Sequence, residues 1–235
     1  MRTFFLYLIL AVLCWNCKSE APTSIIVSVL SDKTDTIIPS PKMAHIKPFF
    51  EDPKYDNGTR TFRFQTITNT NVNKAYKAEL KAFSVFGNSL QQKSDVSKFY
   101  KRIDTLLSRE NDIHESYQNS SIIIPLIIQL KKVKAAHTNT KIVLLYSDLF
   151  EASDVFNVYR SKDRYLLNSK IESVIANFKS KVAIPQLTGV ELYIIYYPKT
   201  MNDNRLFQQM SFVYRELFKD TGLKLHIGID NPITP

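Results

Sequence analysis

Three short polar segments carry the side chains of this sequence that could bind an ion. Asp32, Thr34 and Thr36 alternate along a turn directly after an apolar run. Ser120 precedes a second apolar run, and Asp148 follows a third. The first turn can aim one carboxylate and two hydroxyls at one point, and a later hydroxyl and carboxylate would complete an octahedral, all-oxygen shell. Because Mg²⁺ prefers such ligands and retains some of its waters, the pattern predicts a divalent-cation site with Mg²⁺ as the first candidate.

The elements that must position these side chains alternate between strands and helices. Short apolar and β-branched runs predict strands at 24–30, 61–68, 76–85, 141–146, 190–197 and 225–229. Apolar residues at helical spacing predict a short helix at 42–51 and longer helices at 94–107, from 120 onward, at 163–179 and at 203–219. Ser94 is the expected N-cap of the 94–107 helix, and Ser120 or Ser121 caps the next, with Pro125 in its first turn.

This order predicts an α/β fold arranged as a three-layer α-β-α sandwich. Apolar strands separated by amphipathic helices indicate a mostly parallel sheet of Rossmann-like topology, covered on both faces. The short polar connection at 69–71 joins two strands as a hairpin, which places an antiparallel strand at one edge. No repeat or linker divides the chain, so residues 24–235 are expected to form one domain. Ligands of such sheets bind at the carboxyl ends of the strands, where the polar segments lie.

Composition and missing motifs exclude several other kinds of protein. The chain has 235 residues, 44% of them hydrophobic, with five glycines and two cysteines. These numbers exclude a disordered chain, a collagen-like chain and a disulfide scaffold. No glycine-rich loop follows the first strand, so dinucleotide-binding and P-loop motifs are absent. Thr34 stands where a haloacid-dehalogenase-type phosphatase needs its second aspartate. The scattered histidines disfavour a zinc site, and no serine lies in a Gly-x-Ser-x-Gly elbow.

The first 17 residues have the pattern of an export signal. Arg2 precedes twelve consecutive apolar residues at 4–15, a run too short to cross a membrane but suited to a signal-peptide core. Cys17 is followed by Lys-Ser-Glu, and the segment resembles the signals of exported lipoproteins of the Bacteroidetes type. The resemblance implies that Cys17 is acylated as the first residue of the mature chain. Acylation of Cys14, ordinary cleavage and an uncleaved anchor are the alternatives.

We therefore expect a lipoprotein signal peptide at 1–17, a short linker at 18–23 and attachment to a membrane through the N-terminal lipid. The location would be the cell envelope, in the periplasm or at the outer membrane. The formal charge of +9 is compatible with nucleic acid or with a membrane surface. An envelope location argues against nucleic acid as a binding partner. The densest basic run, at 131–134, would be a solvated helix face that makes a weak contact with anionic headgroups.

The polar segments and the order of elements together resemble the von Willebrand factor A-type domain over about residues 24–229. The resemblance is carried by the edge hairpin and by four sequence features: the Asp32-x-Thr34-x-Thr36 turn, Ser147-Asp148 after a buried strand, Gly189-Val190 at the entry of the next strand, and the long helix that follows. The sequence departs from the family pattern at Asp35, where a small residue is usual, and at Leu149, where glycine is usual. The segment at Ser120 reads Asn-Ser-Ser in place of a Thr-Gly-Thr-like motif.

The resemblance implies a metal-ion-dependent adhesion site and a protein partner. Position by position, Asp32, Thr34, Thr36, Ser120 (or Ser121) and Asp148 would hold a divalent cation whose open position takes an acidic side chain of that partner. A metal-assisted hydrolase, with Glu151 as general base, is the alternative enzyme reading. A third reading is a metal-free structural protein, in which the same carboxylates only cap turns and helices.

Overall fold

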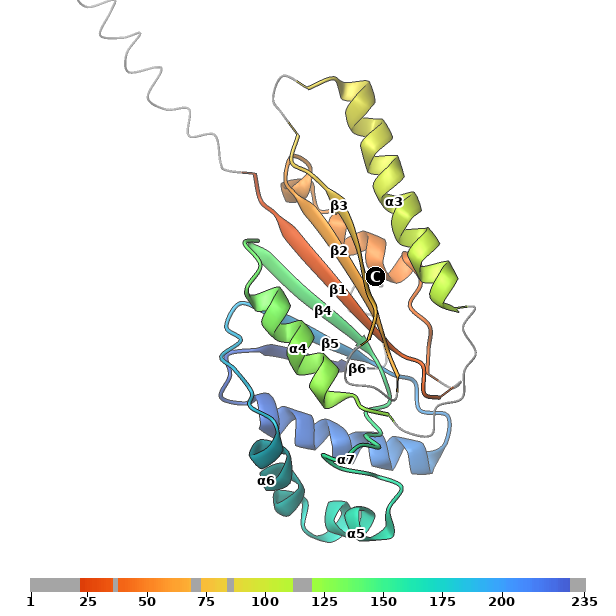
Figure 1. Cartoon of the computed structure of the whole chain (residues 1–235), viewed down its shortest axis with the longest axis vertical. Coiled ribbons are helices and arrows are strands. Elements are labelled where there is room, and N and C mark those ends of the chain that lie inside the picture. Colours follow the sequence, from red (N-terminus) through yellow and green to blue (C-terminus); the bar gives the residue numbers. More distant parts are fainter. Residues whose placement is uncertain (1–21, 36–37, 69–72, 84–86, 112–119, 229–235) are drawn as a thin grey trace, which may run out of the picture.

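The structure is a computed structural model, and it describes residues 22–35, 38–68, 73–83, 87–111 and 120–228. Six strands form one sheet in the order β3-β2-β1-β4-β5-β6 (Figure 1). Their bounds are β1 Ile25–Asp32, β2 Arg60–Ile67, β3 Ala75–Leu80, β4 Thr140–Tyr146, β5 Glu191–Ile195 and β6 Lys224–Gly228. All neighbours pair in parallel except β2 and β3. The predicted α/β class and the antiparallel edge strand are confirmed.

The central strands form because their residues suit burial on both faces of a sheet. Every residue of β1 is buried, and five consecutive residues of β4 from Ile142 to Tyr146 are buried as well. Such continuous apolar runs, rich in β-branched side chains, are typical of parallel strands. The edge strand β6 alternates between exposed and half-buried residues instead. The core therefore lies around β1 and β4, the two strands that end in Asp32 and Tyr146.

Helices pack around this sheet. Their bounds are α2 Met43–Ile46, η1 Lys47–Phe50, η2 Pro53–Tyr55, α3 Ser89–Asn111, α4 Ile123–Lys134, α5 Ser161–Ser169, α6 Ile171–Lys181 and α7 Met201–Phe218. α3 packs against β3 and β2, α4 against β4 and β1, and α7 against β6, while α6 lies on α7 (Figure 1). No helix in the described part of the chain is both long enough and apolar enough to cross a membrane.

Two of the helix predictions were wrong in their boundaries. The single helix expected at 163–179 is two helices, because Lys170 leaves helical geometry with φ −146° and ψ 54°. Asn168 and Ser169 precede this break, and such side chains compete with the helical backbone for hydrogen bonds. The helix expected from Ser94 starts at Ser89 instead, where the Asn88 carboxamide oxygen accepts from the Leu90 N–H.

Candidate functional site

The loops that follow β1 and β4 meet at the carboxyl end of the sheet. Ser31 of β1 is the register partner of Tyr146 of β4. The residues that follow them, Asp32 and Ser147, therefore also lie side by side. The Ser147 hydroxyl donates to Asp32 Oδ2 at 2.8 Å and accepts from the Leu149 N–H at 3.0 Å. The parallel pairing of two buried strands thus fixes the Asp32 carboxyl against the loop that carries Asp148.

The turn after β1 joins Asp32 and Thr34 as the spacing predicts. Thr34 donates to Asp32 Oδ1 twice, from its N–H at 3.0 Å and from its hydroxyl at 2.6 Å. This local turn fixes the rotamer of Asp32 and holds a hydroxyl beside its carboxyl group. Asp32 itself is 2% exposed. Thr36, the third predicted ligand of this turn, lies outside the described residues.

Asp148 is held by the tight turn that leaves β4. Its Oδ1 accepts from the Phe150 N–H at 2.8 Å, and the residue is 2% exposed. Leu149, between them, has φ +65°, in the left-handed region where glycine is the favoured residue. The leucine side chain is fully buried in the core. Burial of this side chain contributes about 2 kcal/mol, which is enough to offset the roughly 1–2 kcal/mol cost of the left-handed conformation.

The two buried carboxyls repel each other. Burial raises the pKa of Asp32 above its ordinary value, and hydrogen bonds from Thr34 and Ser147 only partly oppose this. The pKa of Asp148 is raised well above its ordinary value, first by burial and then by repulsion from Asp32. Across the part of the chain that the structure describes, no lysine or arginine forms an ion pair with either group. The positive charge that would balance both carboxylates is therefore missing among the described side chains.

Ser120 reaches the same end of the sheet without capping a helix. Its N–H and C=O both bond to the backbone of Ala152, at 3.2 and 2.8 Å, which places it beside the loop after β4. Its hydroxyl is buried and has no hydrogen-bond partner among the described residues. The expected N-cap at Ser120 or Ser121 is wrong, because α4 begins at Ile123 and its N-cap residue is Ile122. A buried hydroxyl without a partner is costly, so the Ser120 oxygen is available to a ligand or a water.

Glu151 caps α4 from a distant part of the sequence. Its Oε2 accepts from the N–H groups of Ile122 at 3.0 Å and Ile123 at 2.9 Å, and its Oε1 accepts from the Ser153 hydroxyl. Burial raises the pKa of Glu151 to about 7 despite these bonds. Sequence analysis assigned this residue only as a general base. No local pattern identifies the cap, since 28 residues separate Glu151 from Ile123.

Two buried tyrosines lie close enough to the acidic cluster of Asp32, Asp148 and Glu151 to feel its charge. Tyr214 of α7 is buried, and its pKa is raised by burial and then by repulsion from all three carboxyls. Tyr196, which follows β5, has its pKa raised by burial and next by Asp148. Neither hydroxyl has a hydrogen-bond partner in the described part of the chain. Two buried hydroxyls near the cluster are therefore available to a ligand or a water.

These residues can bind a cation only through carboxyl oxygens that are not already occupied by hydrogen bonds. A carboxylate offers about four lone-pair sites. Asp32 Oδ1 already accepts two bonds, and Asp32 Oδ2 and Asp148 Oδ1 accept one each. Within the described residues, no side chain or backbone group is recorded as donating to Asp148 Oδ2. Among the described residues, no three His, Cys, Asp or Glu side chains form a group that could hold a metal ion. A cation here would depend on the two aspartates together with hydroxyls, which is the ligand chemistry of Mg²⁺.

The sequence-predicted residues are thus brought together in part. Asp32 and Thr34 are hydrogen-bonded to each other, and Asp148 follows Ser147, whose hydroxyl bonds to Asp32. Ser120 lies on a segment bonded to the same loop after β4. Ser147, which holds Asp32 in place, was named in the motif but not as a site residue. Cys17, the predicted lipidation site, lies outside the described residues.

Comparison with known proteins gives a structural likeness but no family. No protein family model matches the sequence, and no curated protein matches it. The fold is similar to that of a solved structure described as the D319A mutant of the PilB minor pilin from Streptococcus sanguinis, with 10% identity and a TM-score of 0.48. The similarity covers 92% of this chain and 59% of that one, so the chain spans less than two thirds of its length.

Proposed function

We propose that this chain is a lipid-anchored protein of the cell envelope whose von Willebrand A-like domain binds a protein partner through a divalent cation. Asp32, Thr34, Thr36, Ser120 and Asp148 would hold the ion, most simply Mg²⁺. The observation that carries the proposal is the pair of buried aspartates at adjacent strand ends, Asp32 and Asp148, with raised pKa values and no cationic side chain paired to them among the described residues.

The three-layer arrangement of this domain type draws support from side chains that alternate along β4. Gln129 of α4 donates to the Ser28 hydroxyl, and Ser28 is the register partner of Val143. Tyr146, which stacks on His45 of α2, lies three residues beyond Val143. Side chains three apart on a strand point to opposite faces. Contacts of α4 and α2 on opposite sides of the sheet are what a three-layer domain requires.

The proposed mechanism follows from what each group can contribute. The hydroxyls of Thr34 and Ser147 donate to Asp32 and so keep its carboxyl in one orientation. Asp148 would supply the second negative charge and Ser120 a neutral oxygen. A divalent cation would remove the repulsion between the two aspartates, and one coordination position would remain for a carboxylate of the partner. Tyr159 lies between β4 and α5 and is exposed, and tyrosine is a residue type enriched where proteins bind.

The test is cation-dependent thermal stability of the chain and of its Asp32→Ala variant. We expect Mg²⁺ or Mn²⁺ to raise the melting temperature of the unaltered chain and to leave that of the variant unchanged, because binding to the folded state alone stabilises it. Asp154→Ala is the matched control, since Asp154 is an exposed aspartate of the loop after β4. It should retain the full shift. Equal shifts in Asp32→Ala and the unaltered chain would overturn the proposed site.

The enzyme alternative draws no support from the position of Glu151. Both of its oxygens accept hydrogen bonds from the protein, and it is fully buried, so it lacks the access to water that a general base needs. The metal-free alternative is decided by the same melting experiment: it requires that no divalent cation shifts the melting temperature of the unaltered chain.

A further inference from the structure

The amino end of the sheet, opposite the acidic cluster, gathers lysines. α4 and α7 run antiparallel to the strands, so their C-terminal turns lie where β4 and β6 begin. We call the lysines found there the amino-end lysines: Lys131, Lys132, Lys134, Lys141, Lys219 and Lys224. Backbone and side-chain bonds tie these segments together, with the Lys134 ammonium on the Thr188 carbonyl and the Lys141 ammonium on the Lys134 carbonyl.

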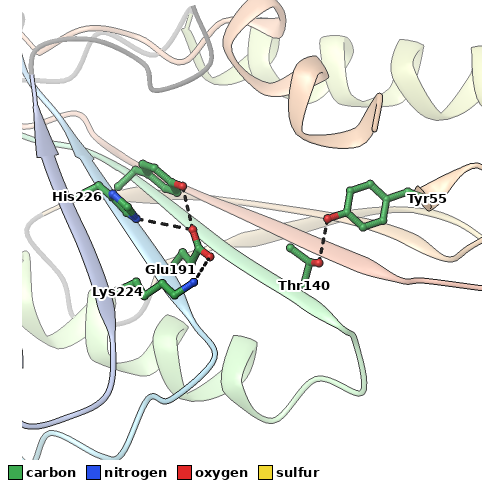
Figure 2. A network of polar contacts seen from close by, with 6 residues as sticks. Tyr55, Thr140, Glu191, Lys224 and His226 are labelled. Carbon is green, nitrogen blue, oxygen red and sulfur yellow. Dashed lines mark hydrogen bonds and ion pairs between the residues drawn. The ribbon is translucent and has the colours of Figure 1, made fainter. Parts of the chain in front are cut away.

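Most of this positive charge has no acidic partner. Lys131 and Lys132 are exposed and form no ion pair within the described residues. Carbonyl oxygens bind Lys134 and Lys141 but carry no net charge to neutralise them. Lys224 pairs with Glu191 at 3.2 Å, as Figure 2 shows, and Lys219 pairs with Glu216 at 3.8 Å. The surface therefore keeps an excess of positive charge from Lys131, Lys132, Lys134 and Lys141.

The chain enters the fold at this same end. Ser24, just before β1, bonds to Asn139, just before β4, through its N–H and its hydroxyl, both at 2.9 Å. Tyr55 closes the same end by donating to Thr140 at 2.9 Å (Figure 2). Five residues separate Cys17 from Pro22, where the described chain begins, and five extended residues span about 17 Å at most. A lipid on Cys17 would thus hold the amino end within about two Debye lengths of a bilayer at physiological salt.

We infer that the amino-end lysines form a surface that lies on an anionic bilayer, so that the acidic cluster at the carboxyl end points away from the membrane. The inference rests on the proposed N-terminal anchor for its geometry. Anionic lipid headgroups match the charge of the surface, and each lysine held near such a surface strengthens binding about fivefold. This orientation leaves the proposed cation site open to a partner, whereas the reverse orientation would press buried acids towards negative headgroups.

The test is lysine acylation of the full chain on vesicles, read by mass spectrometry. Neutral phosphatidylcholine vesicles are compared with vesicles that contain about one third phosphatidylglycerol. We expect Lys131 and Lys132 to react several-fold more slowly on the anionic vesicles. Lys162 and Lys199, exposed lysines near the carboxyl end, are the internal controls and should react equally on both. About 0.5 M salt, with a Debye length of about 4 Å, should remove the difference.

Variants separate the surface from the anchor. Lys131→Glu with Lys132→Glu should abolish the extra protection of Lys219 on anionic vesicles, while Lys162→Glu with Lys199→Glu should not. Flotation of the chain with neutral vesicles reports the anchor alone, and its failure would contradict the proposed lipid attachment. If the chain floats with both vesicle types and Lys131 and Lys132 react at the same rate on each, the basic surface does not meet the bilayer and this inference is overturned.

Discussion

The two ends of the sheet differ in the burial and the pairing of their charged side chains. At the carboxyl end, Asp32, Asp148 and Glu151 are at most 2% exposed, and nearby hydroxyls have no hydrogen-bond partner among the described residues. At the amino end, Lys131, Lys132, Lys219 and Lys224 are exposed, and only the last two form ion pairs among the described residues. Buried charge without a counter-charge lowers the stability of the fold, whereas exposed charge is nearly neutral to it and acts over distance.

This difference has a functional meaning. Groups with raised pKa values that converge at strand ends are where binding sites of parallel sheets are found. The amino end has no comparable enclosure, and its charge is suited to broad contact with a surface. One end is therefore expected to bind a specific ligand, and the other to set how the molecule is oriented.

The largest effect should come from removing the Glu151 cap. Glu151→Ala leaves the N–H groups of Ile122 and Ile123 buried without acceptors, so we expect the free energy of unfolding to fall by about 2–4 kcal/mol. Urea denaturation at pH 8, above the raised pKa of Glu151, measures it. Glu151→Gln is the matched control, because its amide oxygen can still accept both bonds, and it should lose less than about 1 kcal/mol. Equal losses in both variants would show that charge, and not capping, is what Glu151 provides.

Stability should fall as pH rises, which tests the acidic end without a mutation. An acid whose pKa is raised by folding holds its proton more tightly in the folded state, so stability declines between the unfolded and folded pKa values. For Glu151 that interval runs from 4.5 to about 7. Asp32 and Asp148 act in the same direction. With divalent cations chelated, we expect the free energy of unfolding to be about 2 kcal/mol lower at pH 8 than at pH 5.

Other titrating groups do not reverse this sign. The carboxyls of Asp52, Asp95 and Glu191 have lowered pKa values and are already ionised at pH 5. His45, whose pKa is lowered by burial, acts in the opposite direction but is one partly buried group against three acids. Glu151→Gln should reduce the decline. Stability that stays level or rises from pH 5 to pH 8 would contradict the raised pKa values of the cluster.

Sequence patterns predicted the features that depend on residues close together in the sequence. The strands, the hairpin and the Asp32–Thr34 turn each follow from spacings of a few residues, and all are present. The contact of Ser147 with Asp32 required the register of β1 against β4, which becomes readable only once the two strands are known to be adjacent. The break at Lys170 was missed because the apolar pattern continues across it at helical spacing.

The cap of α4 shows why features that depend on contacts between distant parts of the sequence could not be predicted. Two serines directly before the helix are a normal capping signal, yet Ser120 is drawn into backbone bonds with Ala152. The loop after β4 then delivers a carboxylate to the helix N-terminus, where the helix dipole favours negative charge. Local capping preference is worth about 1 kcal/mol, and a charged acceptor bonded to two N–H groups exceeds it.

Substituting the amino-end lysines should have the smallest effect on the free energy of unfolding. A small effect is what the contrast between the two ends of the sheet predicts. Lys131 and Lys132 lie in the last turn of α4, where a positive charge gains about 0.3–1 kcal/mol from the helix dipole, but Lys134 crowds them with like charge. These terms oppose each other, so Lys131→Gln with Lys132→Gln should change the free energy of unfolding by no more than about 0.5 kcal/mol. Urea denaturation of the double variant beside Asp148→Asn checks this. Asp148→Asn removes the repulsion from Asp32. In the absence of metal it should change the free energy of unfolding by more than the lysine double variant does. A loss above about 1 kcal/mol in the lysine variant would mean that these lysines support the fold, and the contrast between the two ends would then no longer hold.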